Sequence, residues 1–382
     1  MTSTNAVPRP PEAHPRVSRI DQVVHILAAH DAIGAHVLHC RDALRQAGYE
    51  SDIYAGDAHP EVREHALPLD DLSTSRSKRR WLLFHHSTGS AVAEAVLRRP
   101  EPVILDYHNI TPASYVSRWA PAMREELELG REQLDALAPR SFYGIAHSSF
   151  SRRELEAAGI GHTNVVAPMF DMTHATADPD VSDALAKERA SGGADWLFVG
   201  RLSPHKAQHD LVKALAAYRR LYDPRARLHL VGTSLGTDYP RALERFAHRL
   251  GIADDIRTPG SVSSEALVAY YRSADVFVCA SDHEGFCVPL VEAMHLGLPV
   301  VAYGAAAVGE TVGDGGLVLP DKTPVRMATA VRRVVADGAL RDALVHLGRK
   351  RAASFSLAAV GRQLVSALDD AHIVAAELGV PA

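Results

Sequence analysis

Two basic side chains, Arg201 and Lys206, lie in the segment Gly-Arg-Leu-Ser-Pro-His-Lys, directly after the apolar run 196–200. The pattern predicts a strand over that run and a helix over 206–221. Both cations would then lie beside a helix N-terminus, where unpaired N–H groups and the helix dipole favour anions. The segment indicates a diphosphate site that needs no metal ion. Two solvated basic residues are the alternative interpretation.

Two glutamates, Glu284 and Glu292, lie in and after a second loop of this kind. The loop follows the predicted strand 275–279 and leads into a predicted helix over 288–296. Gly285 lets the backbone approach a ligand closely. The amides that would face this ligand belong to Phe286, Cys287 and Val288. Each carboxylate could accept hydrogen bonds from a vicinal diol of a sugar or ribose, whereas a helix cap and a surface ion pair are the alternative.

Two weaker signals accompany these loops. Ser261 and Val262 follow another predicted strand end, where a glycine turn is common and says little by itself. His85 and His86 end a predicted strand of the first half. They either line an acceptor pocket or are structural.

The chain shows no pattern typical of a metal site. His205 and His209 have a spacing that places two rings on one helix face, but the glutamate of the metalloprotease motif is missing. The three cysteines, Cys40, Cys279 and Cys287, do not form a zinc or disulfide pattern. We therefore expect no bound metal, and the low cysteine usage favours a reducing cytoplasm.

Short β-branched runs alternate with amphipathic helical segments from Val23 onward. This alternation predicts a parallel sheet covered by helices on both faces. A helix is expected over 35–47, with Gly48 as its stop. The strands expected in the first half are 23–27, 52–55, 81–85, 103–106, 142–146 and 164–166.

The alternation lapses over 173–193, which is poor in large apolar residues and typical of a linker. It restarts at Trp196. The strands expected in the second half are 196–200, 228–231, 255–258, 276–279, 299–302 and 317–319. The helices expected there are 206–221, 239–250, 264–273 and 288–296, followed by a helical tail over 324–378.

These elements predict an α/β protein with two successive doubly wound, parallel-sheet domains. We expect a disordered leader over 1–20, an N-terminal domain over 21–172 and a linker over 173–193. A C-terminal domain over 194–355 and a final helix over 356–382, packed back on the N-terminal domain, would complete the chain. Such folds bind ligands beyond the carboxyl ends of their strands, which is where both loops lie.

The two loops resemble glycosyltransferase family 4, whose members are retaining, nucleotide-sugar-dependent enzymes with the two-domain, Rossmann-like GT-B fold. The resemblance rests on Gly-Arg-Leu-x-x-x-Lys at 200–206 and Glu-Gly-Phe-x-x-Pro-x-x-Glu-Ala at 284–293. It spans nearly the whole chain from Val23 and is densest over 196–319. Tyr-His-Asn-Ile-Thr-Pro at 107–112 is similar to the family's acceptor-side histidine loop.

The resemblance implies a role for each matching residue of the second half. Arg201 and Lys206 would neutralise the donor diphosphate. Glu284 would hold the hydroxyls of the transferred sugar, and Glu292 would hold the nucleotide ribose. The backbone amides expected to assist Glu284 are those of the 285–287 turn.

The first half would supply the opposite wall of the cleft. The resemblance implies that Gly34 lets the N-terminal domain approach the diphosphate and that His108, beside Asn109, faces the sugar. The chain also departs from the family pattern at three points. Many relatives have glycine in place of Ala207 and Cys287, and a glycine pair in place of Gly34 alone.

The implied function is transfer of a hexose-like unit from a nucleotide diphosphate sugar to a hydroxyl acceptor, with retention and without a metal. In the front-face route commonly proposed for the family, the leaving phosphate oxygen takes the acceptor proton. A nucleotide-sugar epimerase or a sugar phosphorylase on the same fold is the second enzyme class. A sugar-nucleotide-binding protein that has lost transfer activity is the third.

Charge and hydropathy exclude other partners. Forty-six acidic against 41 basic residues give a net charge of −5, which offers no global attraction for nucleic acid or an anionic bilayer. No apolar stretch approaches the roughly 20 residues of a membrane span. The basic-aromatic cluster 76–81 is expected to be a solvated loop, with peripheral membrane contact as the alternative.

Overall fold

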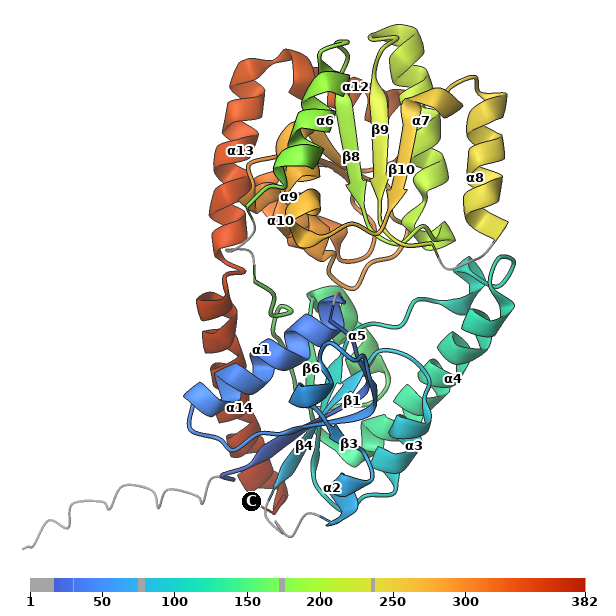
Figure 1. Ribbon diagram of the computed structural model, residues 1–382. Helices are drawn as coiled ribbons and strands as arrows, with labels where there is room; N and C mark the ends of the chain where they lie inside the picture. Colours follow the sequence, from blue (N-terminus) through green and yellow to red (C-terminus); the bar gives the residue numbers. More distant parts are fainter. Residues whose placement is uncertain (1–16, 30, 75–79, 172–175, 235–237, 382) are drawn as a thin grey trace, which may run out of the picture.

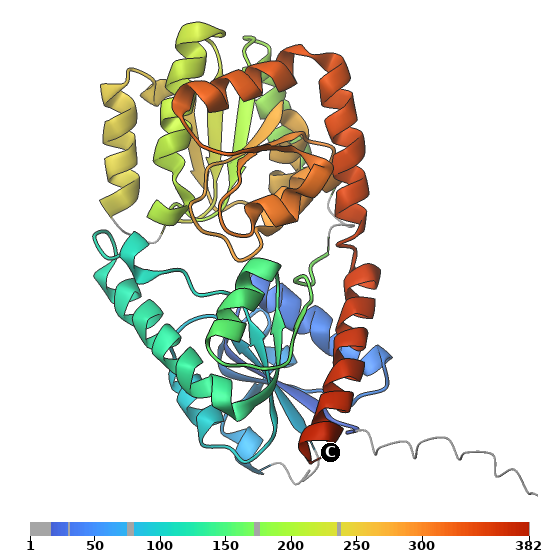
Figure 2. The same cartoon turned by 180° about the vertical axis from the view of Figure 1, so that it is seen from behind.

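The computed structural model describes residues 17–29, 31–74, 80–171, 176–234 and 238–381. They form two α/β domains, and the last helix runs back from the second domain along the first (Figures 1 and 2). Each domain is built on one parallel sheet with helices on both faces. The expected pair of doubly wound domains is therefore confirmed.

The sheet of the first domain has the strand order β3-β2-β1-β4-β5-β6-β7. The order reverses between β1 and β4, the position at which such sheets bind ligands. Its strands are β1 (Ile20–Leu27), β2 (Ile53–Ala58), β3 (Leu67–Pro68), β4 (Trp81–His86), β5 (Val103–Tyr107), β6 (Ser141–Ala146) and β7 (Thr163–Val165). Its helices are α1 (Ala32–Gln46), α2 (Asp71–Thr74), α3 (Ala91–Leu97), α4 (Pro121–Leu137) and α5 (Ser149–Ala157).

The sheet of the second domain has the order β10-β9-β8-β11-β12-β13, with the reversal between β8 and β11. Its strands are β8 (Asp195–Val199), β9 (Arg227–Val231), β10 (Ile256–Gly260), β11 (Val276–Cys279), β12 (Val300–Tyr303) and β13 (Leu317–Leu319). Its helices are α6 (Pro179–Arg189), α7 (Gln208–Leu221), α8 (Asp238–Arg249), α9 (Ser264–Ser273), α10 (Val288–His295), α11 (Val308–Val312), α12 (Pro324–Ala336) and α13 (Gly338–Ala353).

Helix α6 lies inside the stretch 173–193, where the sequence favoured a linker. Asp178 caps this helix by accepting hydrogen bonds from the backbone N–H groups of Asp180 (2.9 Å) and Val181 (3.1 Å). The helix packs on α9 and therefore belongs to the second domain. Of its residues only Leu185 is buried, so its sequence carries almost no amphipathic signal.

Two helix starts differ from the sequence prediction. Helix α1 begins at Ala32, so Gly34 lies in its first turn and not in a preceding loop. Lys206 lies in a 3-10 turn, Pro204–Lys206, and helix α7 begins after it at Gln208.

Helix α14 (Leu357–Leu378) packs against α1 and β6 of the first domain. The Tyr49 hydroxyl lies 3.1 Å from Nε2 of His372, and the Trp81 indole N–H donates to the Pro381 carbonyl at 2.9 Å. Where the domains join, the centroids of the Phe286 and Phe355 rings lie 5.1 Å apart. The chain end is thus bound to the first domain.

Two expectations fall at the edges of the described residues. Residues 1–16 of the expected leader lie outside them, whereas Val17 is buried, so the fold begins before residue 21. Of the basic cluster 76–81 only Arg80 and Trp81 are described, and both are buried. Arg80 Nη2 donates to Glu101 at 2.8 Å, so this end of the cluster is not a solvated loop.

None of the described helices combines the length and the apolarity that a bilayer crossing requires.

Candidate active site

Lys206 and Glu284 form an ion pair at the carboxyl edge of the second sheet. Lys206 follows β8 and Glu284 follows β11, and these strands are neighbours, so their loops meet. The ammonium lies 2.8 Å from Oε1 and 2.7 Å from Oε2 of the carboxylate. The side chains are 22% and 6% exposed. The two residues that the resemblance assigns to the diphosphate and the sugar are therefore in direct contact.

The environment keeps the Lys206 ammonium charged. Burial lowers the pKa of Lys206, but the adjacent Glu284 carboxylate outweighs burial, and the pKa is raised above its usual value. A phosphate oxygen can replace the carboxylate at the ammonium, and a sugar hydroxyl can replace the ammonium at the carboxylate. Until a ligand does so, each charge satisfies the other.

The backbone beside each partner adopts a glycine-like conformation. Ala207 has φ 50° and Cys287 has φ 79°, both in the left-handed region. These are two of the positions at which the family pattern has glycine. The chain keeps the turn without glycine, which costs about 1 kcal/mol at each position.

Arg201, Glu292, Ser261, Val262 and Val288, which are further predicted donor residues, follow strands of the same sheet but make none of the hydrogen bonds or ion pairs that the described residues form with this pair. Arg201 is exposed, and its carbonyl accepts a hydrogen bond from Gln208 Nε2 at 2.9 Å. Glu292, half-buried on α10, accepts a 2.6 Å hydrogen bond from the Tyr271 hydroxyl. Burial raises the pKa of Glu292. The remaining candidates are exposed Ser261 and half-buried Val262, after the edge strand β10, and half-buried Val288 at the start of α10.

The Glu284 loop touches the first domain through Asn109. The His283 ring donates from Nε2 to Asn109 Oδ1 at 2.6 Å, and Asn109 Nδ2 donates to Glu154 at 2.9 Å. A Cβ on Gly285 would lie 2.6 Å from the Asn109 Cβ, so only glycine allows this approach. The predicted sugar-binding loop and the predicted acceptor loop are therefore neighbours.

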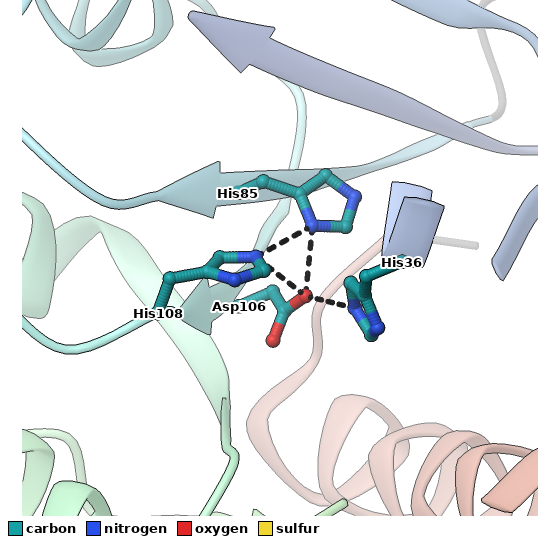
Figure 3. Close-up of side chains that lie close together, drawn as sticks. All are labelled: His36, His85, Asp106 and His108. Atoms are coloured by element: carbon teal, nitrogen blue, oxygen red, sulfur yellow. Dashed lines mark hydrogen bonds and ion pairs between the residues drawn. The ribbon is translucent and has the colours of Figure 1, made fainter. Parts of the chain in front are cut away.

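Four histidines surround one buried carboxylate, Asp106, at the carboxyl edge of the first sheet. Oδ2 of Asp106 lies 2.9 Å from His36 Nε2, 2.8 Å from His85 Nδ1 and 3.4 Å from His108 Nε2 (Figure 3). His147 Nε2 lies 3.6 Å from Oδ1. Burial lowers the pKa of His108 to about 4 and that of His147 to about 3, so both are neutral at pH 7. The surrounding imidazoles outweigh burial and hold the pKa of Asp106 well below its usual range.

Two predicted residues lie apart from this site. His86 is on the opposite face of β4 from His85; its Nε2 donates to the Gly130 carbonyl at 2.9 Å, and burial lowers its pKa to about 4. A Cβ on Gly34 would lie 1.9 Å from the Ala28 carbonyl oxygen. Glycine is thus required for packing between β1 and α1, whatever its role toward the donor.

Sequence reasoning missed several residues of these two clusters. His36, Asp106 and His147 were not singled out, nor was Lys322, whose ammonium lies 2.7 Å from Asp282 in the Glu284 loop. Only part of a signal for the histidine cluster existed. His85, Asp106, His108 and His147 end or directly follow strands, whose carboxyl ends share one edge of a parallel sheet, but local patterns do not show which of these strands are neighbours.

Residues 184–351 match the family model described as "Glycosyl transferases group 1". The chain is 35% identical over 261 residues to the D-inositol 3-phosphate glycosyltransferase of Geodermatophilus obscurus, over 65% of this chain and 55% of that protein. It is 31% identical over 298 residues to the protein of the same name from Frankia alni, over 73% and 71%. A GDP-mannose-dependent alpha-(1-6)-phosphatidylinositol monomannoside mannosyltransferase of Mycobacterium tuberculosis is 31% identical over 58% and 56%. The chain spans little more than half the length of the Geodermatophilus and Mycobacterium relatives.

Solved structures share the fold. Anabaena HepE in complex with UDP-glucose superposes with a TM-score of 0.72 at 19% identity, over 91% of this chain and 99% of that one. WaaG, a glycosyltransferase involved in lipopolysaccharide biosynthesis, gives 0.67 at 12% identity, over 90% and 98%. The expected GT-B fold is confirmed. Together with the match to the Frankia protein, the loop motifs confirm the family resemblance as well, and the chain belongs to the group 1 glycosyltransferases.

Proposed function

We propose that the chain is a retaining glycosyltransferase that moves a sugar from a nucleotide diphosphate sugar to a hydroxyl acceptor. The contact between Lys206 and Glu284 carries the proposal. A cation suited to a diphosphate and a carboxylate suited to sugar hydroxyls lie within one hydrogen bond of each other. In a nucleotide sugar the diphosphate and the sugar meet at the glycosidic bond that breaks, so the groups that bind them must lie this close together.

Lys206 and Arg201, and no divalent ion, neutralise the diphosphate in this proposal. The bond between the anomeric carbon and the phosphate oxygen breaks, and the acceptor oxygen bonds to the same face of that carbon. The departing phosphate oxygen takes the acceptor proton. Because negative charge on the diphosphate grows as the bond breaks, both cations stabilise the transition state more than the bound donor.

Glu284 acts on the transferred sugar and Glu292 on the ribose. The sugar ring gains positive charge in the transition state, so a carboxylate beside it assists the reaction, whereas the ribose does not change. His108 faces the sugar from the first domain, and His85 and Asn109 lie on the acceptor side of it. The contact between Asn109 and His283 supports this placement because it joins the two loops.

The acceptor belongs to the class of hydroxyl compounds that the relatives' names suggest, with inositol phosphates first. We also place the protein in the cytoplasm without a membrane partner or with a peripheral one. Its three cysteines are free thiols, which suits a reducing compartment.

The test is release of nucleoside diphosphate from a panel of UDP- and GDP-sugars, with and without inositol 3-phosphate and simpler polyols. A transferase releases the diphosphate with the acceptor and forms a retained glycoside. Lys206→Ala should abolish most turnover, whereas Lys213→Ala, on the exposed side of α7, should not. EDTA should leave the Kd of the diphosphate unchanged. An epimerised donor, phosphate-dependent cleavage, or binding without turnover would each replace this proposal by one of the three alternatives.

A further inference from the structure

The hydrogen bonds around His108 determine where its ring proton lies. His147 Nδ1 lies 2.9 Å from the Val166 carbonyl, which can only accept, so His147 carries its proton on Nδ1. Its Nε2 is therefore an acceptor and lies 3.1 Å from His108 Nδ1. His108 donates from Nδ1, and its Nε2 is left with a lone pair.

The same reasoning applies to the rings on the other side of Asp106. His85 Nε2 lies 2.9 Å from Gln22 Oε1 and donates to it, so His85 Nδ1 also carries a lone pair. The Met169 backbone N–H donates to His36 Nδ1 at 2.8 Å. His36 therefore has its proton on Nε2 and donates it to Asp106.

Three acceptor atoms consequently face one another: His85 Nδ1, His108 Nε2 and Asp106 Oδ2. Their separations are 2.8, 3.2 and 3.4 Å, and their side chains are 0%, 5% and 2% exposed. Acceptors this close in a buried place need a cation among them. We propose that His85, Asp106 and His108 bind a divalent first-row transition-metal ion, with zinc as the ion that suits the set.

The spacing of the three atoms suits such an ion. Ligands at zinc distances of about 2.0–2.1 Å lie roughly 3.3 Å apart in a tetrahedral site. An ion can therefore lie at that distance from all three atoms without moving any of them. Two imidazoles and one carboxylate leave a coordination position open, as in catalytic zinc and non-haem iron sites.

The surrounding contacts are those that metal-binding histidines usually make. Each ligating ring donates its second N–H, His85 to Gln22 and His108 to His147, and His36 orients the carboxylate. His36 and His147 are thus positioning residues. The other close set, Cys279, Glu284 and Cys287, has no similar need, since the Lys206 ammonium already supplies its cation.

This site was not expected from the sequence, and it does not replace the two cations at the diphosphate. It belongs to the first domain, one residue from Asn109, which contacts the Glu284 loop. The open coordination position of the bound ion would accept a hydroxyl group of the acceptor. That last step rests on the proposed function, whereas metal binding itself does not.

The test uses the full-length chain, stripped with a chelator and titrated with Zn²⁺ and Co²⁺ in the absence of any nucleotide sugar. We expect one ion per chain with a Kd in the micromolar range or tighter. The cobalt form should show visible d–d bands and lack a thiolate charge-transfer band. His85→Ala and Asp106→Asn should weaken binding at least 100-fold, and His147→Ala about 10- to 100-fold through loss of orientation.

The control is His209→Ala, which removes a histidine of α7 in the second domain and should leave the stoichiometry unchanged. A Kd for Zn²⁺ weaker than about 0.1 mM would overturn the metal site, because a proton shared by the three acceptor atoms would then fill it. That result would leave the proposed transferase function unaffected. A thiolate band would move the metal to a cysteine, either Cys40, whose sulfur lies 3.2 Å from His36 Nε2, or Cys279 and Cys287, and would overturn the assignment. If the variants fail to fold, the cobalt spectrum of the unaltered chain still decides.

Discussion

Replacing Lys206 by methionine keeps most of the side-chain volume and removes the cation that faces Glu284. Glu284 is 6% exposed, and both of its oxygens are bound by this ammonium, so the change leaves a buried charge unpaired. Removing one partner of a buried pair costs about 3–5 kcal/mol. Because the Lys206 side chain is 22% exposed, we expect the free energy of unfolding to fall by about 3 kcal/mol.

Removing both charges should cost less than removing one. Lys206→Met combined with Glu284→Gln leaves two neutral groups, so the loss should be about 1 kcal/mol and the coupling energy about 2 kcal/mol. Urea unfolding followed by tryptophan fluorescence measures these values, with Trp196 buried in β8 of the affected domain. Lys213→Met is the control, since its ion pair with Asp210 involves a 42% exposed lysine and should contribute less than about 1 kcal/mol. A loss of less than about 1 kcal/mol for Lys206→Met, or a double variant as unstable as that single variant, would refute the reasoning.

Three further outcomes follow from the geometry. His86 has a pKa of about 4 in the folded protein, below its value in the unfolded chain. Between pH 6.5 and 4 the unfolded chain therefore binds more protons than the folded protein, and the free energy of unfolding should fall as the pH falls through that window. This residue alone should contribute about 3 kcal/mol to the loss, and His86→Gln should flatten the pH profile of urea unfolding. Ala207→Gly, at φ 50°, should leave stability unchanged or raise it by up to about 1 kcal/mol in thermal denaturation, whereas Ala214→Gly within α7 should lower it by about as much. Glu292→Ala should raise the donor KM roughly 10- to 150-fold with kcat largely kept. Glu284→Gln should instead lower kcat more than it raises the donor KM. If calorimetry shows that both variants lose affinity for the nucleoside diphosphate equally, this division of roles is wrong.

Most strands could be predicted because both sheets are covered on both faces. The segments Trp81–His86 and Val276–Cys279 are buried at every position. Because both faces of such a strand are covered, its sequence is a continuous run of strand-forming residues that is easily recognised. Helix α6 could not be predicted in this way, because its packing on α9 buries only Leu185.

The contact between Lys206 and Glu284 could be predicted because each residue belongs to a local pattern at a strand end, and the two strands are neighbours. The surroundings of Asp106 could not. His36, His85 and His147 are single residues far apart in the chain, without periodicity. Only the strand order β1-β4-β5-β6 brings them to one carboxylate, and local patterns do not encode that order.

In the proposed reaction Lys206 acts on the diphosphate as the glycosidic bond breaks. The most direct test is steady-state kinetics of Lys206→Ala with the donor and acceptor identified by the panel. We expect kcat to fall by roughly 10²–10³, as when one oxyanion donor is removed, with the donor KM changed only a few-fold. A raised donor KM with unchanged kcat would show that Lys206 only binds the donor, and would contradict this role in the transition state.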